Sequence, residues 1–179
     1  MSPSCLALAL SFFAAPDCAP LGAAGPDLGG RAEAAVVPGG FAAPARSLSG
    51  WAEMLSALNA VRKAGATCGG TPMPPAAPLV WDRRLAAAAD RHVRDMATHK
   101  RFSHRGSDGL HAGERARRMG YDWRALGENI ARHQRSVDQV LDDWLASPSH
   151  CRQIMSPAYA EVGAAKVGGY WAQVFGTFR

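Results

Sequence analysis

The hydrophobic pattern of this chain changes its period near residue 160, and this change limits the available folds more than any other feature. Before that point, apolar residues recur at three- and four-residue steps in several segments, as in amphipathic helices. Beyond it, residues alternate with their neighbours from Val162 to Phe178, with an interruption at Gly168-Gly169. This alternation predicts two antiparallel strands joined by a tight turn. Helices followed by paired strands predict an α+β domain with a small antiparallel sheet covered by helices.

The helical signals fall in five segments. The clearest helix follows Asp82, a favourable N-cap residue, and runs to about Lys100. Ser136 and Gln139 form a capping-box signature for another helix, which should end at Ser147-Pro148. The other predicted helices cover residues 51–64, 111–119 and, as a last turn or two, 150–155.

Two further segments are less regular. Residues 68–78 contain four prolines, which remove backbone donors, so the sequence predicts an extended loop there. Residues 126–131 are short and mixed enough in character to form either a strand or a turn. The folded domain as a whole is expected over residues 49–179.

The composition fits one domain with an uneven charge. A chain of 179 residues with 47% hydrophobic content can form a single core. The formal net charge is +5, and residues 83–135 alone carry 13 basic and 6 acidic side chains. Because these arginines alternate with Ala, Leu and Met at helical spacing, a solvated helical surface is the favoured interpretation, and an anionic partner such as an envelope glycan or lipid headgroup is the alternative. The pattern does not favour nucleic acid, and no transmembrane segment is predicted.

The first residues predict export. The apolar run from Cys5 to Ala15 has the length of a signal-peptide core and is too short to span a bilayer. We therefore expect a signal peptide over residues 1–24, a flexible Ala/Gly/Pro-rich leader over residues 25–48, and a secreted or periplasmic location. No basic residue precedes the apolar run, so a misassigned start or a disordered tail is the alternative.

The cysteine count fits one disulfide. Of four cysteines, Cys5 and Cys18 fall within the signal segment, and Cys68 and Cys151 remain. In an oxidising compartment these two are expected to pair, and closing so long a span would add about 4.5 kcal/mol in the chain-entropy model. Two unrelated thiols are the alternative.

The sequence lacks the motifs of several common classes of enzyme and metal-binding protein. It contains no Gly-rich phosphate loop and no HExxH, GxSxG or CxxC motif, which argues against the commonest nucleotide-binding, zincin, α/β-hydrolase and zinc-ribbon proteins. His92 and His99 lie seven residues apart on one side of the helix after Asp82 and could share a ligand. More often, such histidines are satisfied at the margin of a core.

Five dispersed segments carry a family resemblance. They are Phe102-Ser103-His104, Gly127-Glu128-Asn129-Ile130, residues 144–155, Ala160-Glu161-Val162-Gly163, and residues 170–176. In this order and spacing the chain resembles the CAP superfamily (cysteine-rich secretory proteins, antigen five and pathogenesis-related proteins), and especially its short bacterial extracellular members. The resemblance covers the chain from about Met54 to Arg179. It implies a three-layer α/β/α sandwich.

The resemblance also implies a cleft with two His and two Glu, which in some members holds a divalent metal. His104, Glu128 and Glu161 match three of these positions, and Tyr170 stands where the second His is expected. One imidazole and two carboxylates could still bind zinc or manganese, although a neutral phenol is a poor ligand. Two other interpretations are open. One carboxylate could act as a general acid or base beside His104, or the groups could only fix the cleft through hydrogen bonds.

Three more residues in these segments receive structural interpretations. His150 is expected to cap a helix end and tie its loop to the core. Trp144 and Trp171 could line a pocket for an apolar ligand, but core packing is the favoured interpretation.

The incomplete tetrad and the lack of a recognisable nucleophile predict a monomeric, non-catalytic binding module for a lipid, sterol, cell-envelope glycan or protein partner. The alternative from another class is a peptidase-like hydrolase that uses His104, Glu128 and Glu161 with or without a metal. A third hypothesis is a structural role in an envelope or spore coat, motivated by the basic stretch and the small size.

Overall fold

A four-stranded sheet forms the middle layer of this computed structural model, which describes residues 48–179. The strand order is β3-β5-β6-β4, and all neighbours are antiparallel except β3 and β5, which run parallel. The predicted hairpin is confirmed, because β5 and β6 are joined at Gly168 and Gly169, both with positive φ. The strands of the sheet are β3 (Val80–Trp81), β4 (Trp123–Arg132), β5 (Glu161–Val167) and β6 (Tyr170–Phe178).

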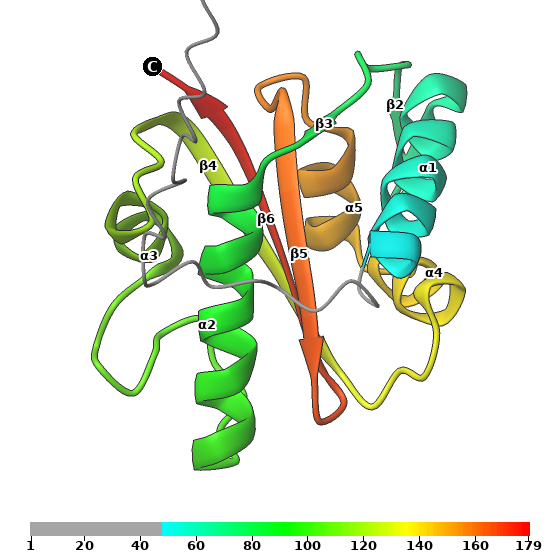
Figure 1. Cartoon of the computed structure of the whole chain (residues 1–179). Coiled ribbons are helices and arrows are strands. Elements are labelled where there is room, and N and C mark those ends of the chain that lie inside the picture. The colour runs from blue at the N-terminus through cyan, green and yellow to red at the C-terminus, as the bar shows by residue number, and fades with distance from the viewer. Residues whose placement is uncertain (1–47) are drawn as a thin grey trace, which may run out of the picture. The chain divides into compact units, whose positions relative to one another are not determined.

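Helices cover both faces of this sheet, as Figure 1 shows. One buried cluster joins α2 and α3 to one face, and a second joins α1, α4 and α5 to the other. The predicted three-layer α/β/α architecture is therefore confirmed. The sheet is mixed and not purely antiparallel, because the short strand β3 adds a parallel edge. The helices are α1 (Leu48–Ala64), α2 (Arg83–His99), α3 (Ala112–Arg118), α4 (Val137–Ala146) and α5 (Pro148–Met155).

Helix α2 shows why the local sequence folds as predicted. The Asp82 carboxylate accepts hydrogen bonds from the backbone N–H groups of Arg84 (2.8 Å) and Leu85 (3.0 Å), which satisfies the helix N-terminus. The helix lies directly against β5 because Gly163 has no side chain, and a Cβ there would meet the backbone of Leu85 and Ala86. The buried stripe of the helix consists of Leu85, Ala88, Ala89, His92, Val93 and Met96.

The prediction of an extended loop over residues 68–78 is wrong in its first part. Strands β1 (Ala66–Cys68) and β2 (Thr71–Met73) pair as a separate two-stranded ribbon. The turn is possible because Gly69 and Gly70 both take positive φ, as a two-residue hairpin turn requires. A proline inside β2 is tolerated because the ribbon has only two strands.

The remaining elements refine the predictions. Residues 126–131 form the centre of the strand β4, which settles the choice between strand and turn. Helix α5 begins with Pro148 in its first turn, a position where a missing N–H costs nothing, and so starts two residues before the predicted 150–155.

The expected signal peptide (1–24) and all of the expected leader (25–48) except Leu48 lie outside the described residues. Within the described part of the chain, no helix is both long and apolar enough to cross a membrane.

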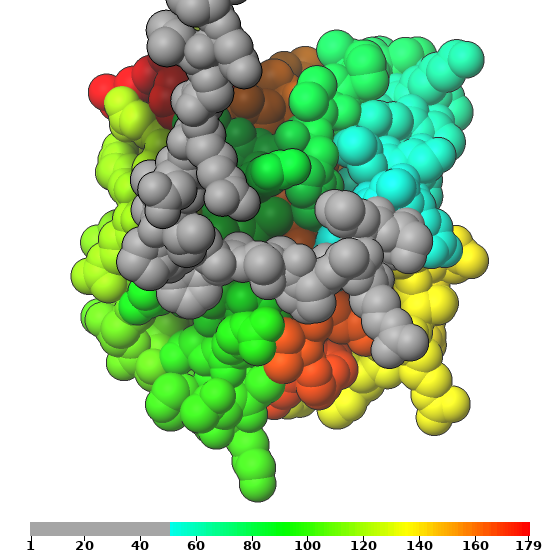
Figure 2. Space-filling model, viewed as in Figure 1, coloured from blue at the N-terminus to red at the C-terminus, as the bar shows by residue number. Residues whose placement is uncertain are grey.

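At the lower end of the molecule in Figure 2, the orange atoms of the β5–β6 turn separate the green α2 layer from the yellow α4 region.

Candidate functional site

The structure brings two of the predicted site residues into direct contact. His104 lies in the segment between α2 and α3, and Glu128 lies in the middle of β4. The Nδ1 atom of His104 is 2.8 Å from Oε1 of Glu128. The two side chains differ in exposure, since 53% of the His104 side chain is accessible to solvent and only 4% of the Glu128 side chain. The pair therefore joins a buried carboxylate to a solvent-facing imidazole.

Glu128 has a second buried partner. Arg115, on α3, donates to Oε2 of Glu128 at 2.6 Å, and its other terminal nitrogen donates to the carbonyls of His104 and Leu110. Burial alone would raise the pKa of Glu128, but the His104 hydrogen bond and the Arg115 charge lower that pKa below its ordinary value. Glu128 is thus ionised at neutral pH and does not serve as a general acid there.

This arrangement fixes the chemistry of His104. A carboxylate beside Nδ1 favours the tautomer in which Nδ1 carries the proton, and this leaves Nε2 as the ring atom available to a partner. Because Arg115 also binds the backbone carbonyl of His104, the loop that carries the imidazole is attached at two points. His104 is therefore a positioned hydrogen-bonding group.

His150 adds a second imidazole near this pair. It lies on α5, which comes from the opposite layer, and the amide of Asn129 donates to its carbonyl at 3.3 Å. Burial lowers the pKa of His150, and the nearby His104 lowers it further. The sequence predicted only a structural role for His150, as a cap of a helix end that ties its loop to the core, and the structure places it in the first turn of α5. The hydrogen bond from Asn129, next to Glu128, shows how the two layers meet beside β4.

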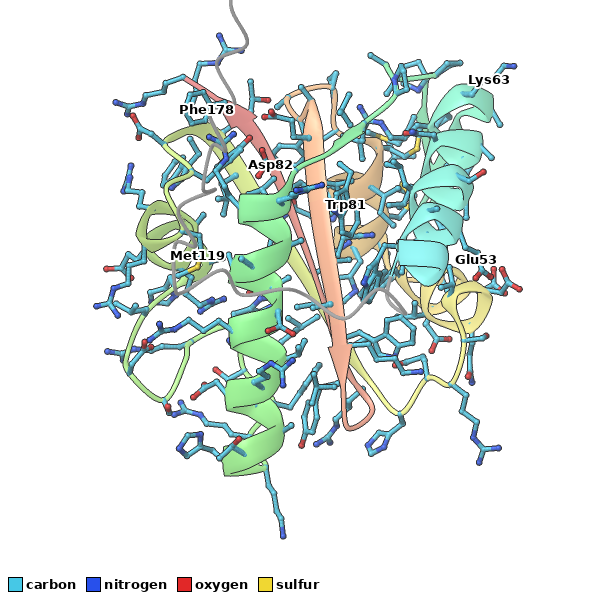
Figure 3. All side chains as sticks on the ribbon, viewed as in Figure 1. Glu53, Lys63, Trp81, Asp82, Met119 and Phe178 are labelled. Carbon is cyan, nitrogen blue, oxygen red and sulfur yellow. A yellow bond between two sulfur atoms is a disulfide. The ribbon has the colours of Figure 1, made fainter. Side chains whose placement is uncertain are left out.

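Glu161 and Tyr170 lie elsewhere on the same face of the sheet. The Glu161 carboxylate accepts a hydrogen bond from the Tyr121 hydroxyl and one from the Phe178 N–H at 3.1 Å. Figure 3 shows Phe178, whose N–H binds Glu161, at the same end of the sheet as Asp82. In the register of the sheet, Glu161 lies opposite Gly176, and Tyr170 lies opposite Val167 at the other end. These positions are about 20 Å apart at ordinary strand spacing, so the four predicted residues do not share one cleft.

The residues present do not fit a divalent metal. Both oxygens of Glu128 face cationic or hydrogen-bonding partners, and Glu161 is bound to Tyr121. Among residues 48–179, no group of three or more His, Cys, Asp and Glu side chains is arranged to hold a metal ion. We therefore derive no chemistry through zinc or manganese at His104, Glu128 and Glu161.

The predicted disulfide between Cys68 and Cys151 is confirmed, with a Cα–Cα distance of 5.4 Å. It links the end of β1 to α5 immediately after His150. The cross-link thus anchors the helix that brings the second imidazole to the site.

Comparison with known proteins assigns the family. The model of the CAP family, described as the cysteine-rich secretory protein family, matches residues 55–175, which is well over half of the chain. The chain belongs to the cysteine-rich secretory protein (CAP) family. The resemblance noted in the sequence is thereby confirmed.

Two curated relatives come from Bacillus subtilis strain 168. The uncharacterized protein YkwD is 28% identical over 100 residues, which is 55% of this chain and 39% of that protein. The uncharacterized membrane protein YlbC is 28% identical over 99 residues, which is 55% of this chain and 29% of that protein. The aligned region therefore spans less than half of the length of either relative.

Two solved structures share the fold. An extracellular protein containing an SCP domain from Bacillus anthracis is 23% identical with a TM-score of 0.63, over 70% of this chain and 39% of that one. An outer surface protein from Borrelia burgdorferi is 16% identical with a TM-score of 0.64, over 74% of this chain and 95% of that one. At these identities the likeness is evidence of fold alone.

Proposed function

We propose that this CAP-family chain is an exported, non-catalytic binding module, and that a cell-envelope glycan docks at the solvent-facing side of His104. The observation that carries the proposal is the commitment of Glu128. Both of its oxygens are engaged by buried or positioned partners, so the pair offers a fixed imidazole rather than a free carboxylate.

An exposed aromatic side chain supports a glycan in preference to the other partners. Phe102 lies two residues before His104, is 41% exposed, and has the Arg132 guanidinium 5.2 Å from its ring centroid. An aromatic face can pack against the apolar face of a sugar ring, while the imidazole and the guanidinium bind its hydroxyl groups. A lipid or sterol would need an apolar surface around these polar groups.

Export is supported by three independent features. The N-terminal apolar run has the length of a signal-peptide core. The Cys68–Cys151 disulfide is of the kind that persists in oxidising compartments. The Bacillus anthracis protein with the same fold is an extracellular protein.

The binding proposal is tested with purified, insoluble cell-wall glycan and matched aromatic variants. Phe102→Ala and His104→Ala should each raise the Kd measured by saturable co-sedimentation about tenfold, as expected when a contact worth about 1.4 kcal/mol is lost. Phe178→Ala is the control, because Phe178 is 42% exposed but lies near Glu161. Equal losses in all three variants, or binding to lipid vesicles and not to glycan, would contradict the proposal.

A hydrolase is the second candidate, because an imidazole held by a carboxylate is also the arrangement of an oriented general base. In that case Nε2 of His104 would take a proton from water, and His104→Ala would abolish turnover of peptide or glycan substrates while the protein stayed folded. Equal turnover by the parent and His104→Ala proteins would remove this candidate.

A further inference from the structure

A polar cavity lies beside α2, next to the His104–Glu128 pair. It has a volume of about 220 Å³ and lies between the second half of the helix and the turn at residues 106–108. In Figure 1 this turn belongs to the green segment that leaves the lower end of α2 and leads to α3. The residues that carry the argument are Arg91, His92, Arg94, Asp95, Asp108 and Arg115.

Buried donors without partners line this cavity. Arg115 and His92 are 2% and 1% exposed. Among the described residues, no group accepts a hydrogen bond from Nε of Arg115, and neither ring nitrogen of His92 has a partner. The Ser103 backbone and Glu128 lie near the His92 ring, and Oε1 of Glu128 is 3.9 Å from Nε2 of His92, beyond hydrogen-bond distance. Buried donors left unpaired are costly, so a bound group or water is expected to satisfy them.

The acidic side chains at the rim already have partners. Asp95 accepts hydrogen bonds from the backbone and the hydroxyl of Ser107, and Asp108 accepts from the Leu110 N–H at 3.1 Å. Asp108 is also paired with Arg91 at 3.3 Å and with Arg118 at 3.6 Å. The unpaired buried atoms of the cavity are therefore Arg115 Nε, which donates, and the two ring nitrogens of His92, of which one donates and one accepts because burial lowers the pKa of this imidazole.

The charge of the surrounding layer favours the same kind of ligand. Residues 83–135, which contain α2 and α3, carry 13 basic and 6 acidic side chains. Arg91 and Arg94 at the cavity rim are exposed. Each guanidinium has five N–H donors, and the contact with its aspartate leaves most of them free. An incoming anion would thus meet a positive field at the rim and unpaired donors beneath it.

We propose that this cavity binds a small oxyanion, the phosphate or carboxylate group of a larger anionic molecule, through Arg115 Nε, His92 and the rim arginine Arg91. The site goes beyond the proposed glycan function, because it uses neither Phe102 nor the free side of His104. It gives the exported module a second point of contact suited to polymers that carry acidic groups.

Nuclear magnetic resonance of the ¹⁵N-labelled protein tests the site directly. Inorganic phosphate is added to one sample and sodium chloride to a control sample, at the same constant ionic strength. The Nε–H resonance of Arg115 is identified by its loss in Arg115→Lys. This resonance should shift progressively and saturate with phosphate but not with chloride. A resonance that does not move with phosphate would overturn the proposal.

A matched pair of arginine variants separates a specific site from general attraction. Arg91→Gln should raise the phosphate Kd by about threefold, as expected for a partly exposed charge contact. Arg83→Gln removes the same charge from an exposed position in the first turn of the same helix, outside the cavity lining, and should leave the Kd unchanged. Equal effects of the two variants would show attraction to net charge and would reject the site.

Further titrations identify the natural source of the oxyanion. A glycerol-phosphate oligomer that binds more tightly than inorganic phosphate would indicate an envelope polymer, and acetate that binds more tightly than phosphate would indicate a carboxylate ligand. Arg91→Gln should still co-sediment with a neutral glycan as the parent does. Loss of phosphate binding alone, or of glycan binding alone, therefore distinguishes failure of this inference from failure of the proposed function.

Discussion

Glu128 and Glu161 lie on the same face of one sheet, but their direct hydrogen-bond partners differ in charge. Glu128 is held by the guanidinium of Arg115 and the ring of His104, so its charge is balanced inside the protein. Glu161 accepts from a neutral phenol, Tyr121, and from a backbone N–H. The difference teaches that Glu128 belongs to a charged network that supports an exposed imidazole, whereas Glu161 belongs to a local set of hydrogen bonds at the sheet end.

Removing the positive partner at the Glu128 end should have the largest effect on stability. Arg115→Met would leave Glu128 buried without its charge partner, and the free energy of unfolding should fall by about 3–5 kcal/mol. Urea unfolding measures this change. The control Arg115→Met/Glu128→Gln removes the unpaired charge and should recover part of the loss. A double variant as unstable as Arg115→Met would contradict this account.

The disulfide should also support the Glu128 end more than the Glu161 end. Cys68→Ala/Cys151→Ala should lower the free energy of unfolding by about 2–5 kcal/mol. Because Cys151 follows His150 on α5, amide hydrogen exchange should accelerate along α5. Exchange at β5, which carries Glu161, should change less. Uniform acceleration in both places would show that the bond stabilises the whole domain without this local emphasis.

The contrast between the two glutamates also shows what could be predicted from sequence. Local patterns identified α2 from its cap and stripe, and the β5–β6 hairpin from its alternation and glycine turn. The ribbon of β1 and β2 was missed because the effect of Gly69-Gly70 was outweighed by the prolines around it.

Site geometry depends on strand register, which no local pattern specifies. The family motif matched His104 and Glu128, and the structure places them in contact. Another segment of the family pattern matched Glu161, on β5. Strand β6 lies between β4 and β5, and along β6 Glu128 is opposite Val174 whereas Glu161 is opposite Gly176. Tyr121, from the segment after α3, reaches the carboxylate of Glu161 through a tertiary contact that has no sequence signal.

A smaller loss of stability than that of Arg115→Met is expected when a contact at the Glu161 end is removed. Tyr121→Phe keeps the buried ring but removes the hydroxyl that donates to Glu161, so the free energy of unfolding should fall by about 1 kcal/mol. Burial raises the pKa of Tyr121, and the hydrogen bond to Glu161 raises it further, so this phenol is neutral at and around neutral pH. Thermal unfolding of Tyr121→Phe compared with Arg115→Met measures the contrast. A loss as large as that of Arg115→Met would mean that the two ends are equally important.

The smallest effect should be a dependence of the free energy of unfolding on pH that arises from His150, near the Glu128 end. Burial and the nearby His104 lower the pKa of His150 below its ordinary value of 6.5, so the folded state binds this proton less readily than the unfolded state. The resulting stability is fully present above pH 6.5 and is lost as pH falls from there toward the lower folded pKa. His150→Gln has no proton to bind, so its free energy of unfolding should decline less than that of the parent between about pH 7.5 and pH 5.5. His133→Gln, which changes a histidine with no such contact to His104, should follow the parent curve, and unfolding at several pH values measures all three. If His150→Gln and the parent lost stability in parallel, the folded state would bind the His150 proton as readily as the unfolded state, and the burial of His150 near His104 would contribute no pH dependence.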